Sequence, residues 1–336
     1  MRSLKTISWI TLAVVVLMAG VSAFMPKKYS AKAEATMDCP ARVTRNIVNN
    51  LGLAKKWLWL PGIDTAYTAS CVGVLKGTGA SCDYNSSLPA SGVIRILNST
   101  PDSISLADER NEGNTTFYKY RITAADPAHA RVTAEATGHS GFLSNLFNFW
   151  HSRKLKNQLE EGLSSLARTG RERYTQGIYN GYKITKTKLD QKYFISYRSE
   201  VEFEHMAKYY SQNISALYQR AMEAKITAAG MPCGLYYKWD DKAGKADMAA
   251  ALPTLAAFSA GDASSVTLRP GDALILTYMG DNAKSASAHF AMDEYMEDHG
   301  LRQIPPVIEE YMTDPAKEPD PARWVTNIMY YVEPIQ

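Results

Sequence analysis

Two residues near the C-terminus could place a negative charge beside an aromatic ring. Glu309 and Tyr311 are two positions apart in a stretch predicted to be a strand, and Glu310 lies between them. Because side chains alternate between the faces of a strand, Glu309 and Tyr311 point to one face and Glu310 to the other. A carboxylate among aromatic rings would suit a cation. On these residues alone, an exposed glutamate beside a core tyrosine is the simpler interpretation.

Other reactive residues lack the spacing of known catalytic or metal sites. The cysteines form no CxxC pair and lie near no histidine at metal spacing, so we expect no metal site. Residues 73–79 lack the Lys-Ser/Thr ending of a phosphate loop, and no G-x-S-x-G motif occurs. His289, Asp293 and Glu297 recur every four residues, but beside an apolar helical stripe we expect them on its solvent flank. We predict no catalytic residue and no cofactor, and whether the chain is an enzyme stays open.

Two of the four cysteines flank a glycine-rich turn. Cys71 and Cys82 stand on either side of Gly77 and Gly79, so they could approach each other across a hairpin. A disulfide there would indicate an oxidising compartment. Two buried free thiols are the simpler interpretation of the sequence, and the pairing is left open.

The composition is that of a folded protein of more than one domain. The chain has 336 residues, 46% of them hydrophobic and 21% charged, which is too long for one typical domain and argues against extensive disorder. The net charge of +3 is small, and no basic stripe or zinc-finger signature appears. We therefore expect no nucleic-acid partner.

The N-terminus carries a long uncharged segment. Residues 7–24 are rich in Val, Leu, Ile and Ala, follow a basic start and precede Lys27 and Lys28. A helix of this length roughly spans a bilayer core of about 30 Å, so we predict a retained transmembrane anchor over residues 1–28. A signal peptide cleaved after Ala23 is the alternative. We expect a single-pass membrane protein with its body in the periplasm; a body on the cytoplasmic face or a cleaved, secreted form are the alternatives.

Residues 29–170 show one strand, short helices, six further strands and a long helix. The last helix is amphipathic, with Leu155, Leu159, Leu163 and Leu166 on one face. This order, together with the segments 39–43, 57–61 and 77–80, resembles the START-like superfamily of polyketide cyclases and lipid-transfer domains. The resemblance implies a helix-grip fold with an apolar cavity between sheet and helix. The aromatic segment 142–150 could cover that cavity, touch a membrane, or simply close the core, which is the simplest interpretation.

The C-terminal half repeats one pattern twice. Each unit is predicted as strand, helix, strand led by proline, and strand, and two such units can form one sheet with both helices on one face. The segment Glu309-Glu310-Tyr311-Met312-Thr313-Asp314-Pro315 and the preceding helix resemble the GyrI-like small-molecule-binding domain, the effector-binding domain of bacterial transcription activators. The resemblance covers residues 190–336, and residues 171–189 are predicted to be the junction between the domains. We therefore expect an α+β protein with a transmembrane helix, a START-like domain and a duplicated β-α-β-β domain.

The GyrI-like resemblance implies a pocket between the two units. Glu309 matches the buried carboxylate of that pocket, Tyr311 lies beside it, and Tyr236 and Trp239 from the related strand complete the predicted ligand-binding set. The expected function is non-catalytic binding of a small hydrophobic or cationic molecule near a membrane. Two alternatives stay open: a hydrolase or cyclase acting in either cavity, and a lipid-handling envelope protein.

Overall fold

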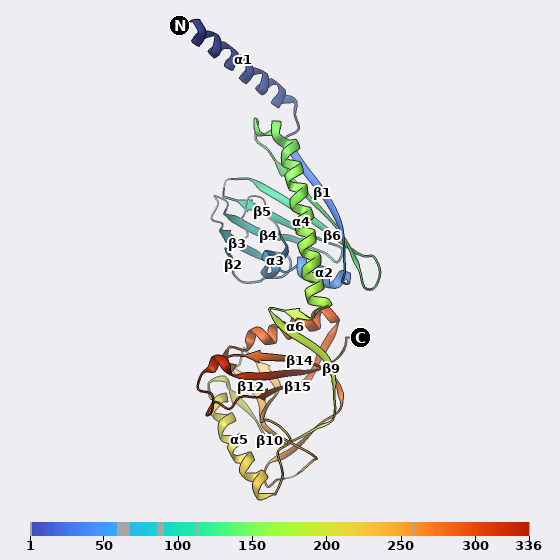
Figure 1. Cartoon of the computed structure of the whole chain (residues 1–336), viewed down its shortest axis with the longest axis vertical. Coiled ribbons are helices and arrows are strands. Elements are labelled where there is room, and N and C mark those ends of the chain that lie inside the picture. The colour runs from blue at the N-terminus through green and yellow to red at the C-terminus, as the bar shows by residue number, and fades with distance from the viewer. Residues whose placement is uncertain (1, 59–67, 86–90, 112, 259, 336) are drawn as a thin grey trace. The chain divides into compact units, whose positions relative to one another are not determined.

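The computed structural model describes residues 2–58, 68–85, 91–111, 113–258 and 260–335. The chain divides into two compact units, Met1–Thr175 and Gln176–Gln336. Each unit contains one antiparallel sheet with helices, which confirms the expected α+β class (Figure 1).

The N-terminal segment forms the predicted helix, α1 (Arg2–Phe24). Its large apolar side chains between Trp9 and Phe24 are exposed, from 39% at Met18 to 93% at Phe24. Across the part of the chain that the structure describes, no helix reaches the length and apolarity needed to cross a membrane. The structure thus gives no support to the transmembrane part of the prediction.

A seven-stranded antiparallel sheet forms the body of the N-terminal unit. Its strand order is β1-β7-β6-β5-β4-β3-β2, so the first strand pairs with the last. The strands are β1 (Lys28–Met37), β2 (Thr68–Cys71), β3 (Ser81–Asn85), β4 (Gly92–Ser99), β5 (Ser103–Arg110), β6 (Thr115–Ala124) and β7 (Ala130–His139). The helices are α2 (Ala41–Val48), η1 (Leu51–Leu53), α3 (Ala54–Trp57), η2 (Ser144–Phe147) and α4 (Asn148–Tyr174). The predicted element order is confirmed, and α4 extends well beyond the expected helix.

The long helix α4 closes one face of this sheet and packs mainly on β1 (Figure 1). Its predicted leucine stripe is buried: Leu155, Leu159, Leu163 and Leu166 are each at most 4% exposed. They join the inward side chains of the strands in one core. Burying four leucines in this way contributes roughly 1.5–3 kcal/mol each, which explains why α4 stays on the sheet. This arrangement of one long helix on an antiparallel sheet agrees with the START-like interpretation, which stays a prediction.

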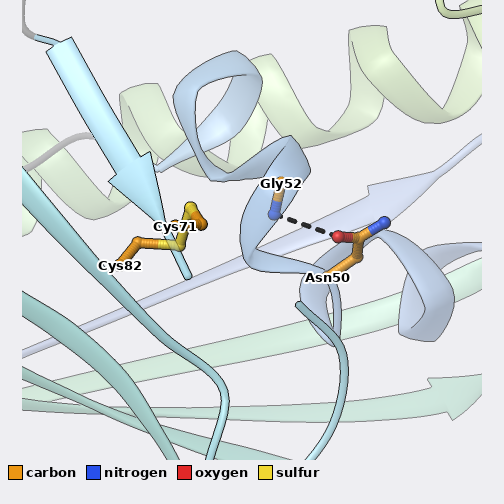
Figure 2. The surroundings of a disulfide bond; sticks show 4 residues. All are labelled: Asn50, Gly52, Cys71 and Cys82. Carbon is orange, nitrogen blue, oxygen red and sulfur yellow. Dashed lines mark hydrogen bonds between the residues drawn. A yellow bond between two sulfur atoms is a disulfide. The ribbon is translucent and has the colours of Figure 1, made fainter. Parts of the chain in front are cut away.

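The cysteine pair that the sequence left open is bridged. Cys71 and Cys82 lie opposite each other in the β2–β3 ladder and form a disulfide (Figure 2). Nearby, Asn50 accepts a hydrogen bond from Gly52 N at 3.0 Å, and Leu51 N donates to Leu75 O at 2.9 Å. The simpler interpretation, two buried free thiols, was wrong, because the hairpin puts the two residues in register.

The aromatic segment 142–150, which runs into the first turn of α4, does not close the core, contrary to the simplest interpretation. Phe142, Phe147, Phe149 and Trp150 are between 50% and 70% exposed. Within this segment Asn145 is buried. The prediction was wrong because the unit's core is complete without these rings.

A nine-stranded antiparallel sheet forms the C-terminal unit, in the order β13-β10-β12-β11-β15-β16-β14-β9-β8. The strands are β8 (Ile178–Tyr179), β9 (Tyr182–Leu189), β10 (Lys192–Glu202), β11 (Cys233–Asp240), β12 (Lys245–Thr254), β13 (Ser264–Leu268), β14 (Gly271–Met279), β15 (Leu301–Tyr311) and β16 (Val325–Pro334). The helices are η3 (Phe203–His205), α5 (Met206–Glu223), η4 (Asn282–Lys284), α6 (Ala286–His299) and η5 (Pro321–Arg323).

The predicted duplication is visible in this strand order. The first repeat is β10-α5-β11-β12, the second is β14-α6-β15-β16, and the two meet where β11 pairs with β15. Helix α5 packs on β10 and β12, and α6 packs on β14 and β15. The boundary between the two units, after Thr175, falls within the predicted junction 171–189, which holds the end of α4 and strands β8 and β9.

Candidate functional site

The central strand pair places the predicted site residues together. Gly234 on β11 lies opposite Glu309 on β15, and Tyr236 lies opposite Val307. Because side chains alternate, Gly234, Tyr236, Glu309 and Tyr311 share one face of the sheet. The ring of Tyr210 from α5 and the imidazole of His289 from α6 contact this set. The site thus lies on the helix-bearing face, where the two repeats meet.

Both oxygens of the Glu309 carboxylate have a partner. Its Oε1 lies 3.0 Å from His289 Nε2, and its Oε2 accepts a hydrogen bond from Tyr311 OH at 3.0 Å. Glu309 is 8% exposed and Tyr311 is half-buried. A buried carboxylate is strongly destabilising without such partners. The pairing explains how the fold tolerates a glutamate at this position.

The hydrogen-bonded chain continues on both sides of Glu309. Tyr311 OH lies 2.8 Å from Tyr236 OH, and His289 Nδ1 lies 2.9 Å from Tyr330 OH on β16. The result is a continuous series of five side chains: Tyr236, Tyr311, Glu309, His289 and Tyr330. Such connected polar groups fix one another's orientation inside a protein.

Burial and the nearby carboxylate keep the tyrosines of this series neutral. Burial raises the pKa of Tyr311 well above its usual value, and the charge of Glu309 raises it further. The pKa of Tyr236 is raised by the same two causes, and that of Tyr330 mainly by burial. The phenols are therefore hydrogen-bond donors at physiological pH and cannot serve as bases there.

Aromatic rings surround the carboxylate. Tyr210 meets Tyr311 edge to face with ring centres 4.7 Å apart, and Trp239 lies 6.1 Å from Tyr236. Trp239 stacks on Phe203 at 4.4 Å and is 53% exposed, so it forms the outer rim. The hydroxyl of Tyr210 is buried and has no hydrogen-bond partner within the described chain. An acceptor on a bound molecule would satisfy it.

Gly234 makes room for the tyrosine pair. A Cβ at this position would lie 2.8 Å from the ring of Tyr236 and 3.0 Å from both hydroxyls, Tyr236 OH and Tyr311 OH. Real Cβ atoms essentially never come this close to other atoms. The absence of a side chain at residue 234 is what lets the two hydroxyls meet.

Sequence reasoning missed three members of the cluster. Its prediction that His289 lies on the solvent flank of its helix was wrong, although Asp293 and Glu297 are exposed as expected. Nothing in the sequence pattern distinguishes Tyr210 and Tyr330 as site residues, because they simply lie in largely apolar segments. His289 directly follows the buried Ala288 and lies three residues before Met292, which places it at the edge of the stripe and within reach of the sheet.

The family comparison matches this part of the chain. Residues 182–332 match the model of a family described as "GyrI-like small molecule binding domain". They form a GyrI-like domain. The match confirms the C-terminal part of the expected architecture and covers both repeats. No match to a family model accompanies the START-like resemblance of the N-terminal unit, which stays a proposal.

Solved structures also resemble this chain, all at low sequence identity. The C-terminal domain of EcmrR is 20% identical over 46% of this chain and 99% of that chain, with a TM-score of 0.40. A chain in a cryo-EM structure of an EcmrR–DNA complex is 18% identical over 58% of this chain and 73% of that chain, with a TM-score of 0.43. SAV2435 bound to tetraphenylphosphonium is 14% identical over 45% of this chain and 94% of that chain, with a TM-score of 0.34. No curated protein matched the chain. The expectation of no nucleic-acid partner stays a prediction.

Other features of the GyrI-like domain lie apart from this cluster. A surface hollow of about 390 Å³ is lined by residues of β10, η3, α5 and β12, among them Glu200, His205 and Lys245. None of the residues of the Glu309 cluster lines it. Beside it, the exposed Glu202, Glu204 and His205 could together offer three atoms to a metal ion. Exposed acidic groups of this kind are common, so the prediction of no metal site is unchanged.

The N-terminal unit has a buried polar cluster of its own. Asp108 is fully buried and accepts hydrogen bonds from Tyr84 OH at 2.5 Å and Arg110 Nε at 3.1 Å. The Tyr118 hydroxyl is buried nearby and has no hydrogen-bond partner within the described chain. The Nε1 atom of Trp57 is likewise buried and has no such partner there. Burial raises the pKa of Tyr118, and the charge of Asp108 raises it further. These groups lie in the core between the sheet and its helices.

Proposed function

We propose that the GyrI-like domain binds a cationic small molecule with aromatic or apolar groups. The observation that carries the proposal is the buried Glu309 carboxylate, held by His289 and Tyr311 at the meeting point of the two repeats. Glu309, Tyr311, Tyr236 and Trp239 are the proposed ligand-contacting residues. His289 and Tyr210 join them on the geometry of the cluster.

The chemistry of the cluster favours a cation. A carboxylate accepts about four hydrogen bonds, and two of these positions on Glu309 are taken by His289 and Tyr311. A cation near the remaining positions would gain the attraction of a charge that is poorly screened by water. The rings of Tyr236, Tyr311 and Trp239 add cation–π attraction of about 0.5–2 kcal/mol where the ligand is desolvated. A neutral apolar molecule would gain only contact with the rings.

The exposed rim suggests how a ligand enters. Trp239 is 53% exposed and stacked on Phe203, while Tyr236 and Tyr311 behind it are half-buried. Movement of these two rings would open a path to Glu309 without breaking the strand pairs. Ligand binding is then expected to reorganise the Tyr236–Tyr311 hydrogen bond.

A hydrolytic role for the same cluster is the second candidate. His289 and Glu309 are 3.0 Å apart and could exchange a proton with a reacting group. No nucleophile of a recognisable motif stands beside them in the sequence, so binding is preferred. Turnover of a bound compound that is lost in Glu309→Gln would reverse this preference.

We also propose a fold for the N-terminal unit and a cellular location for the protein. The sheet covered by one long helix supports a START-like interpretation of residues 29–170. The Cys71–Cys82 disulfide supports an oxidising compartment, such as the periplasm, for this unit. A membrane anchor at residues 1–28, with the binding domain outside the cytoplasm, completes the proposed arrangement.

Calorimetric titration of the full chain with tetraphenylphosphonium tests the proposed function. A single-site signal in the wild type should weaken at least about tenfold in Glu309→Gln, since the variant loses the charge and keeps the shape. Glu310→Gln is the matched control, because Glu310 is adjacent in sequence, points to the opposite face and contacts Asn327. Equal binding by wild type and Glu309→Gln would refute the assignment of the site.

A further inference from the structure

The exposed aromatic segment and the start of the chain form one continuous surface. Asn145, in η2, donates hydrogen bonds through Nδ2 to Ser22 O at 2.7 Å and to Met25 O at 3.3 Å. Ser22 Oγ donates to Asn145 Oδ1 at 2.7 Å and also contacts the carbonyl of Phe142. Ser22 and Asn145 are both at most 1% exposed. The end of α1 is therefore fixed against the segment that precedes α4.

Further hydrogen bonds extend this junction to the first strand. Ser140 N donates to Lys27 O at 2.8 Å, and Asn148 Nδ2 donates to Pro26 O at 2.5 Å. Lys28 and His139 then begin and end the paired strands β1 and β7. Residues 22–28 and 139–150 thus lie side by side at one end of the sheet.

Large apolar side chains project from this junction into solvent. Phe24 is 93% exposed, and Phe149 and Trp150 at the start of α4 are 70% and 62% exposed. Phe142, Leu143 and Phe147 are each about half exposed, and Met25 is 41% exposed. The ring of Trp150 lies 5.9 Å from Phe147 and 6.0 Å from Phe149, so the aromatics form a cluster. Contiguous exposed apolar clusters of this kind mark interaction surfaces.

The two segments that form the cluster carry charge of one sign. Residues 1–33 and 136–159 contain no Asp or Glu, while Lys27, Lys28, Arg153 and Lys154 are all exposed. Arg153 and Lys154 follow Phe149 and Trp150 by four residues, which places each cation one helical turn behind an aromatic ring. Tryptophan and other aromatics in front of a belt of cations match the boundary between lipid headgroups and acyl chains.

We propose that this aromatic–cationic face, residues 24–28 and 142–154, docks on an anionic lipid bilayer. The rings of Phe147, Phe149 and Trp150 enter the headgroup region, and the cations behind them pair with lipid phosphates. The face is separate from the Glu309 cluster and does not depend on the ligand proposed for the GyrI-like domain. It also differs from an anchor that spans the bilayer, because its side chains contact only the headgroup region.

A fluorescent label on the face tests the proposal directly. The remaining thiols, Cys39 and Cys233, are buried, so a thiol-reactive environment-sensitive dye will attach selectively to Phe147→Cys in the full chain. With vesicles of zwitterionic lipid plus phosphatidylglycerol, emission should rise several-fold and shift to the blue. The same dye on Ser215→Cys, exposed on α5, should not respond. Because the dye reports on the face itself, the result does not depend on which part of the chain carries the protein to the vesicle.

Two sets of substitutions separate the contributions. Arg153→Gln/Lys154→Gln should lower the affinity of the labelled face for anionic vesicles about 25-fold, since each cation near such a surface contributes about a fivefold factor. Phe149→Ser/Trp150→Ser should abolish the dye response. Leu255→Ser/Phe290→Ser removes apolar side chains of similar exposure from the other unit and should change nothing. Unchanged melting temperatures would show that all variants fold.

Three outcomes would overturn the proposal. The first is a dye at residue 147 that stays in an aqueous environment while the chain floats with anionic vesicles. The second is an equal response to purely zwitterionic vesicles. The third is a dye shielded without any lipid, together with self-association that Phe149→Ser/Trp150→Ser abolishes, which would identify the face as a contact between two copies of this chain.

Discussion

The imidazole of His289 lies 3.0 Å from the carboxylate of Glu309, and its second nitrogen lies 2.9 Å from the hydroxyl of Tyr330. One side chain of α6 thereby connects the two neighbouring strands β15 and β16. The tautomer with the proton on Nε2 donates to Glu309 and accepts from Tyr330, which satisfies both ring nitrogens. The cluster is therefore held in place by three elements of the second repeat before any ligand arrives.

Removal of this imidazole should destabilise the fold as well as the site. In His289→Ala, one oxygen of the buried Glu309 loses its partner, and the expected cost is about 1–3 kcal/mol in the free energy of unfolding. Urea denaturation of the full chain, followed by the fluorescence of the GyrI-like domain, measures it. In the double variant His289→Ala/Glu309→Gln the cost should be clearly smaller than the sum of the single costs, because the two residues act on one contact. Additive costs would show that the pair is not coupled.

A methyl group at residue 234 should disrupt the tyrosine pair. The Cβ of Gly234→Ala would lie 2.8–3.0 Å from Tyr236 and from the hydroxyl of Tyr311, so the rings must separate. We expect a loss of about 1–3 kcal/mol in stability and a weaker affinity for the cationic ligand. Gly230→Ala is the control, because its Cβ would meet nothing closer than 3.4 Å. Crystallography or the ring-proton NMR signals of the two tyrosines would reveal the displacement, and unchanged signals would contradict it.

Most helices and strands of the fold were predictable, because the local spacing of apolar residues in the sequence agrees with the side chains that are buried. The sequence pattern of residues 115–123 and 130–137 predicted β6 and β7, and the spacing of four leucines predicted α4. The duplicated pattern of the C-terminal half likewise predicted a sheet with two helices. Helix length was less predictable: α5 ends at Glu223, where the sequence continues with helix-compatible residues, because Lys225 adopts a positive φ of 53° and turns the chain away.

The site was predictable only in part, since it depends on contacts between distant segments. Alternation correctly put Glu309 and Tyr311 on one face, and the family resemblance added Tyr236. His289 reaches Glu309 because of the way α6 is rotated about its axis on the sheet. The buried stripe of Ala288, Ala291 and Met292 defines this rotation only approximately, so it does not show whether a residue at its edge faces the sheet or the solvent. The Cys71–Cys82 disulfide likewise depends on strand register, and no spacing rule distinguishes it from two free thiols.

The polar cluster of the N-terminal unit offers a matched pair of tests. Tyr84→Phe removes a hydrogen bond to the fully buried Asp108 and should cost about 1.5–3 kcal/mol, as hydrogen bonds to charged groups do. Tyr118→Phe removes a buried hydroxyl that has no partner in the described chain, so its cost should lie within about 0.5 kcal/mol of zero or be negative. Chemical denaturation of the two variants side by side measures both. A larger loss for Tyr118→Phe than for Tyr84→Phe would show that the hydroxyl of Tyr118 is used.

Alkaline pH should weaken the GyrI-like domain through its tyrosine cluster. Burial and the charge of Glu309 raise the pKa values of Tyr236 and Tyr311 above that of a free tyrosine. A raised folded-state pKa means that the stabilisation is fully present below the unfolded pKa of about 10 and decreases as the pH rises above it. Each such tyrosine lowers the free energy of unfolding by at most about 1.4 kcal/mol per pH unit in that range.

Urea midpoints measured between pH 7 and 11 should therefore be flat to about pH 9 and then fall. In the double variant Tyr236→Phe/Tyr311→Phe this fall of the urea midpoint should be less steep. It should not disappear, because other buried tyrosines also contribute to it. An identical slope in wild type and variant above pH 10 would show that these two phenols ionise freely in the folded protein.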